Sequence, residues 1–304
     1  MGKDGGVKVV IAGASGLIGS ALVRGLAGDG HEVLRLVRRD VRRPDEASWD
    51  PSSRRLDNGL LAGADAVVNL AGAGIGDRRW TDDHKKLVLE SRLDATTTIA
   101  TALTELPSDD RPQVLLNASA VGFYGDTKEE AVDESSPQGE GYLADVVRQW
   151  EEATRPAGEA GVRVVTARSG VVLSGEGGAL GKVLPLFKLG LGGRLGSGRQ
   201  WMSWIAMPDE VAALRFLISN GDVSGPVNLT APEPVRNRDY TKAIAHAVRR
   251  PALAVVPPVA LRAALGGFAD EGVLVSQRVL PSRLEDAGFS FTYADVDSAL
   301  TALL

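Results

Sequence analysis

Short hydrophobic runs separated by amphipathic stretches fill the first half of the chain. Five of these runs predict strands, at 7–12, 32–37, 66–70, 114–118 and 162–168, and a further short strand is expected near 47–49. Between the runs, helices are expected at 17–27, from a Thr81 cap to about 106, and at 142–160, where Pro156 should kink or shorten the helix. Short apolar strands joined by helices indicate a parallel sheet covered on both faces.

The second half of the chain differs from the first in composition and in the spacing of its apolar residues. Residues 174–200 are rich in glycine, which predicts loops that can close over a ligand. Further helices are expected near 208–219, 237–248, 258–265, 281–287 and 294–304, with strands near 227–229 and 254–256. We therefore expect a first domain over residues 1–173, to which 203–220 returns, and a smaller region over 174–304 that forms the other wall of a cleft.

Composition narrows the classes of function. The 304 residues are 44% hydrophobic and 24% charged, as in ordinary soluble proteins, and the net charge of −5 provides no global positive field for nucleic acid or anionic lipid. Cysteine is absent and the three histidines (His31, His84, His246) lie far apart, so no metal site is expected. Signal-peptide and transmembrane patterns are also absent. The sequence predicts a cytoplasmic protein without nucleic-acid, membrane or metal partners, and it leaves the oligomeric state open.

A glycine turn between the first strand and the first helix is the most specific motif. Gly13 permits a tight turn, Gly16 lets the backbone approach a pyrophosphate, and Gly19 lets the helix lie close to the strand. The amino end of the helix then offers free N–H groups and a partial positive charge. The spacing with these flanks predicts a dinucleotide site. The residues expected around its phosphates are Gly13, Ser15, Gly16, Leu17, Ile18 and Gly19.

The end of the second strand indicates which dinucleotide is bound. An NAD site usually has an acidic residue there, whereas this strand ends in Val37, Arg38 and Arg39, and Asp40 follows one or two residues too late. Arginine offers forked donors to a 2′-phosphate. The expected cofactor is therefore NADP, with NADPH bound at least about tenfold more tightly than NADH, a ratio worth ~1.4 kcal/mol. The alternative is that both arginines are solvated loop residues.

Several motifs resemble one group of proteins. The glycine turn, Asn69-Leu70-Ala71-Gly72 and Tyr124-Gly125 resemble the extended short-chain dehydrogenase/reductase superfamily. Within it, the chain is similar to an atypical sugar-nucleotide epimerase subfamily that has a short C-terminal domain of its own. The motifs of this closer likeness are Trp49-Asp50-Pro51, Arg79-Trp80, Ser91-Arg92, Ala118 to Gly125, Trp150-Glu151, Arg168 to Leu173, Ser203-Trp204-Ile205 and Gly288-Phe289.

The resemblance implies a fold and a set of cofactor contacts. The implied fold is α/β, a Rossmann-like doubly wound parallel sheet with a smaller C-terminal α+β region on the substrate side, and the implied cofactor is NADP. Val37 and Arg38 would flank the phosphorylated ribose. The remaining implied contacts are Leu70, Ala71 and Gly72 after the fourth strand, Arg92 on the long helix, and Val172 near the nicotinamide. From the residues alone, Arg92 could equally form a surface ion pair.

The catalytic machinery departs from the family pattern. Ordinary members use a tyrosine and a lysine one helical turn later, where the lysine lowers the tyrosine pKa, together with a serine after the fifth strand. Tyr124 and Lys128 match this spacing but lie in a predicted turn. Tyr142 lies at the expected helical position, with Val146 in place of lysine, and Ser119 lies near the serine position unless a shift of one residue puts Ala120 there. The proton relay is incomplete.

Three functions are compatible with this pattern. The chain is an NADP-dependent oxidoreductase or epimerase that uses Tyr142, Tyr124 or Ser119; an enzyme whose substrate needs little acid–base help; or a non-catalytic NADP(H) sensor. Nucleotide-sugar members have an arginine where Met202 stands, which argues against a nucleoside-diphosphate sugar unless Arg194, Arg199 or Lys188 substitutes. The expected partner is therefore an unidentified small molecule.

Overall fold

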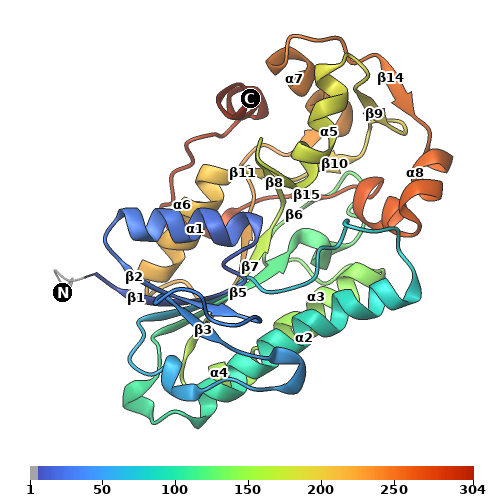
Figure 1. The fold of residues 1–304 in the computed structure, drawn as a ribbon. Coiled ribbons are helices and arrows are strands. Elements are labelled where there is room, and N and C mark those ends of the chain that lie inside the picture. Colours follow the sequence, from blue (N-terminus) through green and yellow to red (C-terminus); the bar gives the residue numbers. More distant parts are fainter. Residues whose placement is uncertain (1–5) are drawn as a thin grey trace.

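A seven-stranded parallel sheet forms the centre of the molecule (Figure 1). The computed structural model describes residues 6–304, so the first five residues of the predicted 1–173 domain lie outside the described residues. The strand order is β12-β7-β5-β4-β1-β2-β3, and every neighbouring pair is parallel. The strands are β1 (Lys8–Ala12), β2 (Glu32–Val37), β3 (Glu46–Ser48), β4 (Ala66–Asn69), β5 (Val114–Ala120), β7 (Arg163–Ser169) and β12 (Gly225–Leu229).

The chain winds outward from β1 in both directions, which makes this a doubly wound sheet. It runs first to β2 and β3 on one side, and then returns to β4, β5 and β7 on the other. The predicted fold class is confirmed. Ligands of such sheets bind at the carboxyl ends of the strands where the order reverses, here between β1 and β4.

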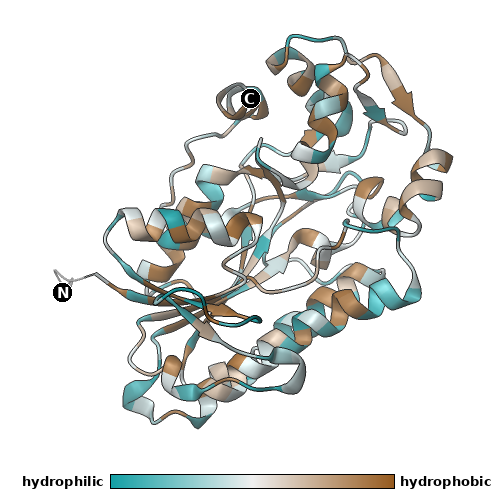
Figure 2. Cartoon of the chain, viewed as in Figure 1, coloured by the Kyte–Doolittle hydropathy of each residue, from teal (hydrophilic) through white to brown (hydrophobic). Residues whose placement is uncertain are grey.

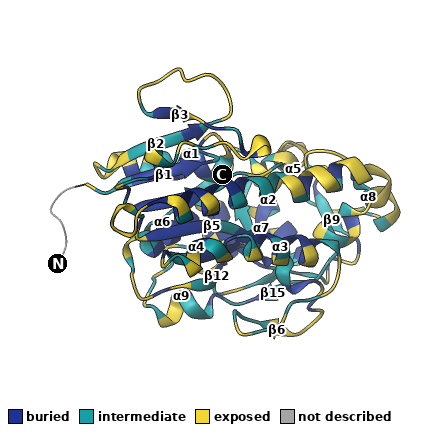
Figure 3. Ribbon diagram, turned by 90° about the horizontal axis from the view of Figure 1, so that it is seen from below, coloured by how far each residue is buried: buried dark blue, intermediate teal, exposed yellow. Residues whose placement is uncertain are grey.

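Strand alternation divides the core between two helical layers. Val9 and Ile11 of β1 face α1 (Leu17–Gly28) and α6 (Met207–Ser219). Val10 faces the opposite layer, which contains α2 (Asp82–Glu105), α3 (Tyr142–Glu152) and α4 (Arg155–Glu159). Successive residues of a strand point to opposite faces, so an unbroken apolar run is what a strand covered on both faces requires. Figure 3 shows these central strands as mostly buried.

Two helix boundaries follow the sequence signals. Thr81 caps α2, its hydroxyl accepting a hydrogen bond from the backbone N–H of His84 at 3.2 Å. The predicted helix at 142–160 is two helices, with Pro156 in the first turn of α4, where its missing N–H costs no helical bond. The predicted interruption at Pro156 is confirmed.

A smaller lobe has its own core. Leu180, Trp204, Ile244 and Leu300 pack together from α5 (Gly178–Lys188), β11 (Trp204–Ala206), α7 (Asn237–Ala247) and α10 (Val296–Leu303). Short parallel or antiparallel pairs β8–β11, β9–β14, β10–β13 and β6–β15 connect its loops. The other elements are β6 (Ala131–Val132), β8 (Val171–Leu173), β9 (Gly193–Leu195), β10 (Trp201–Met202), β13 (Val235–Arg236), β14 (Ala254–Val256), β15 (Arg278–Val279), α8 (Pro258–Leu265) and α9 (Ser282–Asp286).

The glycine-rich stretch 174–200 contains a helix that its composition concealed. Leu180, Leu184 and Phe187 of α5 recur at helical spacing, and all three are buried. Farther along the chain, α6 packs on one face of the central sheet, and β12 adds its seventh strand. The expected domain boundary at residue 173 stays a prediction. No helix within residues 6–304 combines the length and the apolar run needed to cross a membrane.

Candidate functional site

The turn between β1 and α1 is packed too closely for side chains at two positions. Gly13 has a φ of +78°, and a Cβ on it would lie 2.5 Å from the carbonyl carbon of Leu70. A Cβ on Gly19 would lie 2.2 Å from the carbonyl oxygen of Gly13. Only glycine permits this approach of β1, α1 and the end of β4. The roles expected for these two glycines agree with this geometry.

The amino end of α1 is open to a ligand. Gly16 is the cap residue and supplies no side-chain hydrogen bond, and both Ser15 and Gly16 are exposed. The first-turn N–H groups of a helix have no partner inside the helix, so an anion placed here would receive them together with the positive end of the helix dipole. A dinucleotide pyrophosphate fits this turn, with Leu17 and Ile18 half-buried beside it.

The two arginines after β2 have different surroundings. Arg39 donates two hydrogen bonds to the carboxylate of Glu46, at 2.9 and 2.7 Å, and the backbone N–H of Arg42 donates a third at 2.9 Å. The Arg39 guanidinium is the main cause that lowers the pKa of Glu46 to about 2. Arg38 is exposed and makes no ion pair within residues 6–304. Of the two arginines, Arg38, following Val37 at the end of β2, is thus the one whose guanidinium has no ion-pair partner among the described residues.

Arg92 of α2 lies over the turn that follows β4. A Cβ on Gly72 would lie 3.3 Å from Arg92 Cγ, and Arg92 Nη1 donates to the carbonyls of Ala73 and Val88 at 3.0 and 2.9 Å. Its guanidinium carbon is 4.9 Å from the ring centre of Trp150. Burial lowers the pKa of Arg92 to about 10. No carboxylate within the described chain pairs with it, so the surface ion pair considered from the sequence is absent.

Buried amides hold the ends of β4 and β5 in place. Asn69 Nδ2 donates to Asn117 Oδ1 at 2.7 Å and to Thr96 Oγ1 at 3.0 Å, while Trp150 Nε1 donates to the same hydroxyl at 2.9 Å. Asn69 Oδ1 accepts from the backbone N–H of Ala71 at 3.2 Å. This network orients the turn 70–72. The sequence offered one signal for it, an asparagine at the end of an otherwise apolar strand.

Ser119 points into the helical layer. Its hydroxyl donates to Glu151 Oε1 at 2.5 Å, and Arg168 donates to both oxygens of that carboxylate at 2.8 and 2.7 Å. Asn117 lies on the same face of β5, because the two positions are separated by one residue. Ser119 is buried, and its hydroxyl is part of this ion-pair network.

Tyr124 is buried in the same network. Its hydroxyl donates to Asn228 Oδ1 at 2.8 Å and accepts from Arg168 Nη1 at 2.9 Å. Burial raises the pKa of Tyr124. The 3₁₀ turn η4 (Val121–Tyr124) ends at this residue, and Lys128 has a left-handed φ of 54°. The two residues therefore do not share a helical face.

Tyr142 begins α3 and lies near Arg92. Its hydroxyl donates to the carbonyl of Lys85 at 2.5 Å, and the rings of Trp80 and Tyr142 meet edge to face at 5.4 Å. Burial raises the pKa of Tyr142, and the charge of Arg92 opposes that rise. Glu271 from the π-helical turn η5 (Ala269–Val273) accepts the backbone N–H groups of Tyr142 and its neighbour at 3.1 and 2.9 Å. Sequence reasoning did not identify Glu271.

Helix α5 contacts both the glycine turn and the loop after β4. A Cβ on Gly178 would lie 3.1 Å from Leu17 Cδ2, so the start of α5 rests on the glycine turn. One turn later, Lys182 Nζ donates to the Gly76 carbonyl at 2.8 Å and to Asp77 Oδ1 at 3.0 Å, on the loop after β4. Val172, on β8 just before this segment, is half-buried.

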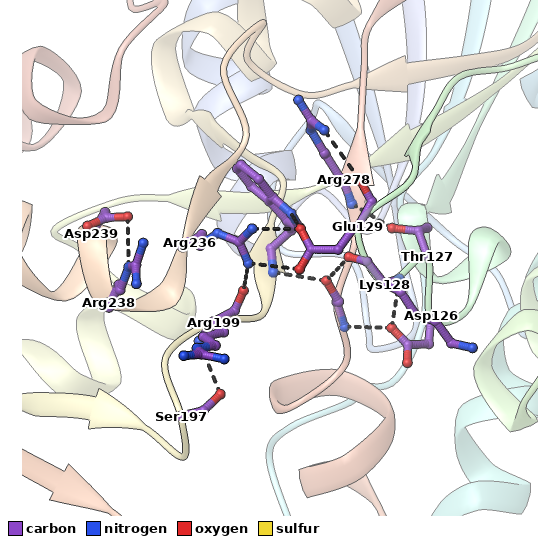
Figure 4. A network of polar contacts seen from close by, with 12 residues as sticks. Asp126, Thr127, Lys128, Glu129, Ser197, Arg199, Arg236, Arg238, Asp239 and Arg278 are labelled. Atoms are coloured by element: carbon purple, nitrogen blue, oxygen red, sulfur yellow. Dashed lines mark hydrogen bonds and ion pairs between the residues drawn. The ribbon is translucent and has the colours of Figure 1, made fainter.

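Arginines of the second lobe enclose a carboxylate from the loop that follows η4 (Figure 4). Arg236 donates to both oxygens of Glu129 at 3.1 and 2.6 Å, and Trp201 Nε1 donates at 3.1 Å. The guanidinium carbons of Arg236 and Arg278 lie 4.4 and 4.7 Å from the Trp201 ring centre. The hydrogen bonds from Arg236 are the main reason why the pKa of Glu129 lies below its usual range. This cluster ties the loop to β10, β13 and β15.

The fold and the glycine turn define a Rossmann-like dinucleotide-binding protein of the extended short-chain dehydrogenase/reductase kind. Comparison with family profiles is consistent with this class: residues 9–230 match the NAD dependent epimerase/dehydratase family. The chain belongs to this family. Residues 256–303 match a second profile, a domain of unknown function named DUF1731.

Relatives match along almost the whole chain. An epimerase family protein of Mycobacterium bovis is 51% identical over 292 residues, which cover 96% of each chain. The chloroplastic SDR39U1 homolog of Arabidopsis thaliana is 37% identical over 99% of this chain and 88% of its own. The crystal structure of human epimerase family protein SDR39U1 (isoform 2) with NADPH has a TM-score of 0.90 at 33% identity, covering 98% of this chain and 99% of that one.

Proposed function

We propose that this protein binds NADP(H) along the carboxyl ends of β1, β2 and β4 and transfers hydride to or from a small molecule, as an oxidoreductase or epimerase. The bound nicotinamide would supply the hydride donor or acceptor. The turn from Gly13 to Gly19 would hold the pyrophosphate, and Val37 and Arg38 the phosphorylated ribose. The turn 70–72, Arg92 and Val172 would line the remainder of the cofactor.

The guanidinium of Arg92 carries this proposal. Removing a cation from water without a counter-ion is unfavourable, and the half-buried Arg92 donates, within the described residues, only to two backbone carbonyls. An anionic cofactor lying over Gly72 would provide the missing negative charge. The relative crystallised with NADPH supports this cofactor.

Arg92 and Tyr142 also offer a substitute for the incomplete proton relay. Reduction of a carbonyl requires a proton on its oxygen, and the raised pKa of Tyr142 keeps its phenol protonated near neutral pH. After Tyr142 gives up that proton, Arg92 would stabilise the phenolate, as lysine does in ordinary members. Ser119 and Tyr124 are bonded to protein groups inside the helical layer, so we assign them structural roles.

The substrate is not expected to be a nucleoside-diphosphate sugar. Met202 offers no charge, and the hydroxyl of Ser203 is buried and bonded to backbone at 277 and 279. Arg194 donates to the carbonyl of Ser197 at 2.5 Å. The half-buried ring of Tyr142 instead favours a substrate with a flat or apolar part.

A non-catalytic NADP(H) sensor is the second candidate. It is favoured by the hydrogen bonds that all three candidate hydroxyls make to protein groups, and by α5, which contacts both the glycine turn and the loop after β4. In this function α5 would change position with cofactor occupancy. The sensor requires the cofactor site but no proton donor.

Two measurements separate these functions. Calorimetry with NADPH and NADH tests the cofactor site, which is refuted if neither binds. Turnover with a panel of aldehydes, ketones and quinones, followed by nicotinamide absorbance, tests hydride transfer. We expect Tyr142→Phe to bind NADPH like the wild type and to lose at least about a hundredfold in kcat, as removal of an acid–base group does. Unchanged turnover in Tyr142→Phe would remove the relay, and NADPH binding without turnover on any compound would favour the sensor.

A further inference from the structure

Exposed apolar side chains gather on one edge of the second lobe. Among residues 6–304, nine large hydrophobic side chains are exposed, and six of them lie on this edge. Leu253 is 88% exposed, Leu189 72% and Val259 71%. We call this set the apolar edge, and it consists of Leu186, Leu189, Leu191, Leu253, Val255 and Val259.

These residues come from segments that lie side by side. β9 and β14 pair in parallel, which brings the end of α5 next to the segment before α8. A Cβ on Gly190 would lie 3.8 Å from Pro251 Cγ, and one on Gly196 would lie 3.5 Å from Pro258 Cγ. In Figure 1 the segments form one side of the lobe, and Figure 2 shows β14 in brown. The segments that carry the apolar edge are therefore neighbours in space.

The charge around the apolar edge is the reverse of that of the whole chain. The chain has a net charge of −5, yet the stretches 177–208 and 240–269 contain no aspartate or glutamate. Lys188, Arg249 and Arg250 lie next to the apolar edge in sequence and are exposed, and no ion pair engages them within residues 6–304. The expectation of no membrane partner rested on the net charge of the whole chain. That single value does not show that these two stretches contain basic residues and no acidic ones.

The geometry and the charge discriminate between possible occupants. A second copy docked by the same edge would bring Lys188, Arg249 and Arg250 of the two copies toward each other, and the carboxylates of Asp77 and Asp270 beside the edge already pair with Lys182 and Arg262. A protein partner needs a complementary surface, whereas side chains exposed by 70% or more project from the lobe into solvent. An anionic bilayer accepts projecting apolar side chains and attracts the cations beside them.

We propose that the apolar edge docks this protein on the surface of an anionic lipid bilayer. The leucine and valine side chains would enter the headgroup region, and Lys188, Arg249 and Arg250 would lie against the phosphates. The attraction between these cations and the anionic headgroups is screened by salt, so binding should weaken as salt rises.

Vesicle flotation of the full chain tests the proposal. We expect binding to vesicles of phosphatidylcholine mixed with phosphatidylglycerol, and little binding to phosphatidylcholine alone. Leu189→Ser with Leu253→Ser should reduce the binding by at least about tenfold, since each removes a large apolar side chain from the headgroup region. Arg249→Gln with Arg250→Gln should reduce both the affinity and its dependence on salt.

Matched variants elsewhere on the surface provide the controls. Leu87→Ser removes a side chain that is 48% exposed on α2, and Arg54→Gln with Arg55→Gln removes another arginine pair. Both should bind vesicles like the wild type, and thermal melts should show that all variants fold. Equal binding to both kinds of vesicle, or unchanged binding of the Leu189/Leu253 variant, would overturn the proposal. So would light scattering that shows a dimer which this variant dissociates, because the edge would then be an interface between copies.

Discussion

Arg39 donates hydrogen bonds from two guanidinium nitrogens to the two carboxylate oxygens of Glu46, at 2.9 and 2.7 Å. Glu46 lies at the start of β3, the strand next to the one that Arg39 follows. An unpaired carboxylate here would repel a 2′-phosphate, and Arg39 neutralises it. The two consecutive arginines therefore differ: Arg39 pairs with Glu46, and Arg38 is the one that we propose contacts the 2′-phosphate.

Arg38→Ala should weaken NADPH binding and leave NADH binding unchanged. A charge-assisted hydrogen bond to phosphate contributes about 1.5–3 kcal/mol, so the loss in NADPH affinity should be at least about tenfold. Calorimetry with both cofactors measures it. Equal losses for NADPH and NADH would place the 2′-phosphate elsewhere.

Arg39→Ala should also weaken NADPH selectively, but for a different reason. The substitution leaves the Glu46 carboxylate without its guanidinium partner. Adding Glu46→Gln to Arg39→Ala should then restore much of the NADPH affinity, because the repelling charge is gone. Failure of this second substitution to restore binding would mean that Arg39 itself contacts the cofactor.

Glu210 should make stability fall as pH rises from about 5 to 8. It is buried in α6, accepts one bond from Ser169 at 2.7 Å, and burial raises its pKa to about 7. The unfolded chain releases this proton near 4.5, so the folded state gains full stability below that pH and loses it as pH passes through 7. The loss is roughly 3 kcal/mol.

Urea denaturation at about pH 5 and about pH 8 measures the contribution of Glu210 to the free energy of unfolding. Glu210→Gln should flatten the pH dependence and exceed the wild type in stability at the higher pH, since the amide carries no charge. The exposed Glu233→Gln serves as control and should follow the wild-type profile. A wild-type profile in Glu210→Gln would show that this carboxyl does not titrate in the range.

The elements of the sheet could be predicted because each depends on local signals. Buried runs define the strands, and the glycine turn defines where β1 meets α1, because Gly13 and Gly19 leave no room for a Cβ. Helix α5 was missed, since its glycines outweighed the helical spacing of its buried leucines. Apart from β14, which was expected at 254–256, the short strands of the second lobe contain only two or three residues, too few for a period to show.

The partners in the site depend on contacts that local sequence does not contain. Glu46 meets Arg39 only through the pairing of β2 with β3. Glu271 reaches Tyr142 from 129 residues away. The direction of Ser119, in contrast, could have been inferred, because it shares a strand face with Asn117 and that face packs against helices.

Ser119→Ala should lower stability and leave cofactor binding intact. The hydroxyl donates to a buried carboxylate, and losing such a bond costs about 1–3 kcal/mol. Glu151→Gln should cost more, about 3–5 kcal/mol, because Arg168 then stays buried without its counter-charge. Thermal and urea denaturation measure both, alongside NADPH calorimetry.

A double variant checks that the pair of charges causes this cost. Glu151→Gln combined with Arg168→Met removes both charges and should be less destabilised than Glu151→Gln alone. Loss of turnover in Ser119→Ala at unchanged stability would instead return Ser119 to a catalytic role.

Gly178→Ala should speed the release of NADPH by loosening α5. Its φ of +67° is costly for alanine, and the new Cβ would lie 3.1 Å from Leu17, so the first turn of α5 must move away from the glycine turn. A cost of about 1–2 kcal/mol in the bound state corresponds to a release rate of NADPH roughly tenfold higher.

Lys182→Ala should speed the release less, because Lys182 and Asp77 are mostly exposed and such ion pairs contribute at most about 1 kcal/mol. Stopped-flow displacement of NADPH measures these rates. Gly181→Ala is the matched control: its Cβ would lie 3.7 Å from its nearest neighbour, an ordinary contact, so release should stay at the wild-type rate. Equal rates for Gly178→Ala and Gly181→Ala would show that α5 does not hold the cofactor in place.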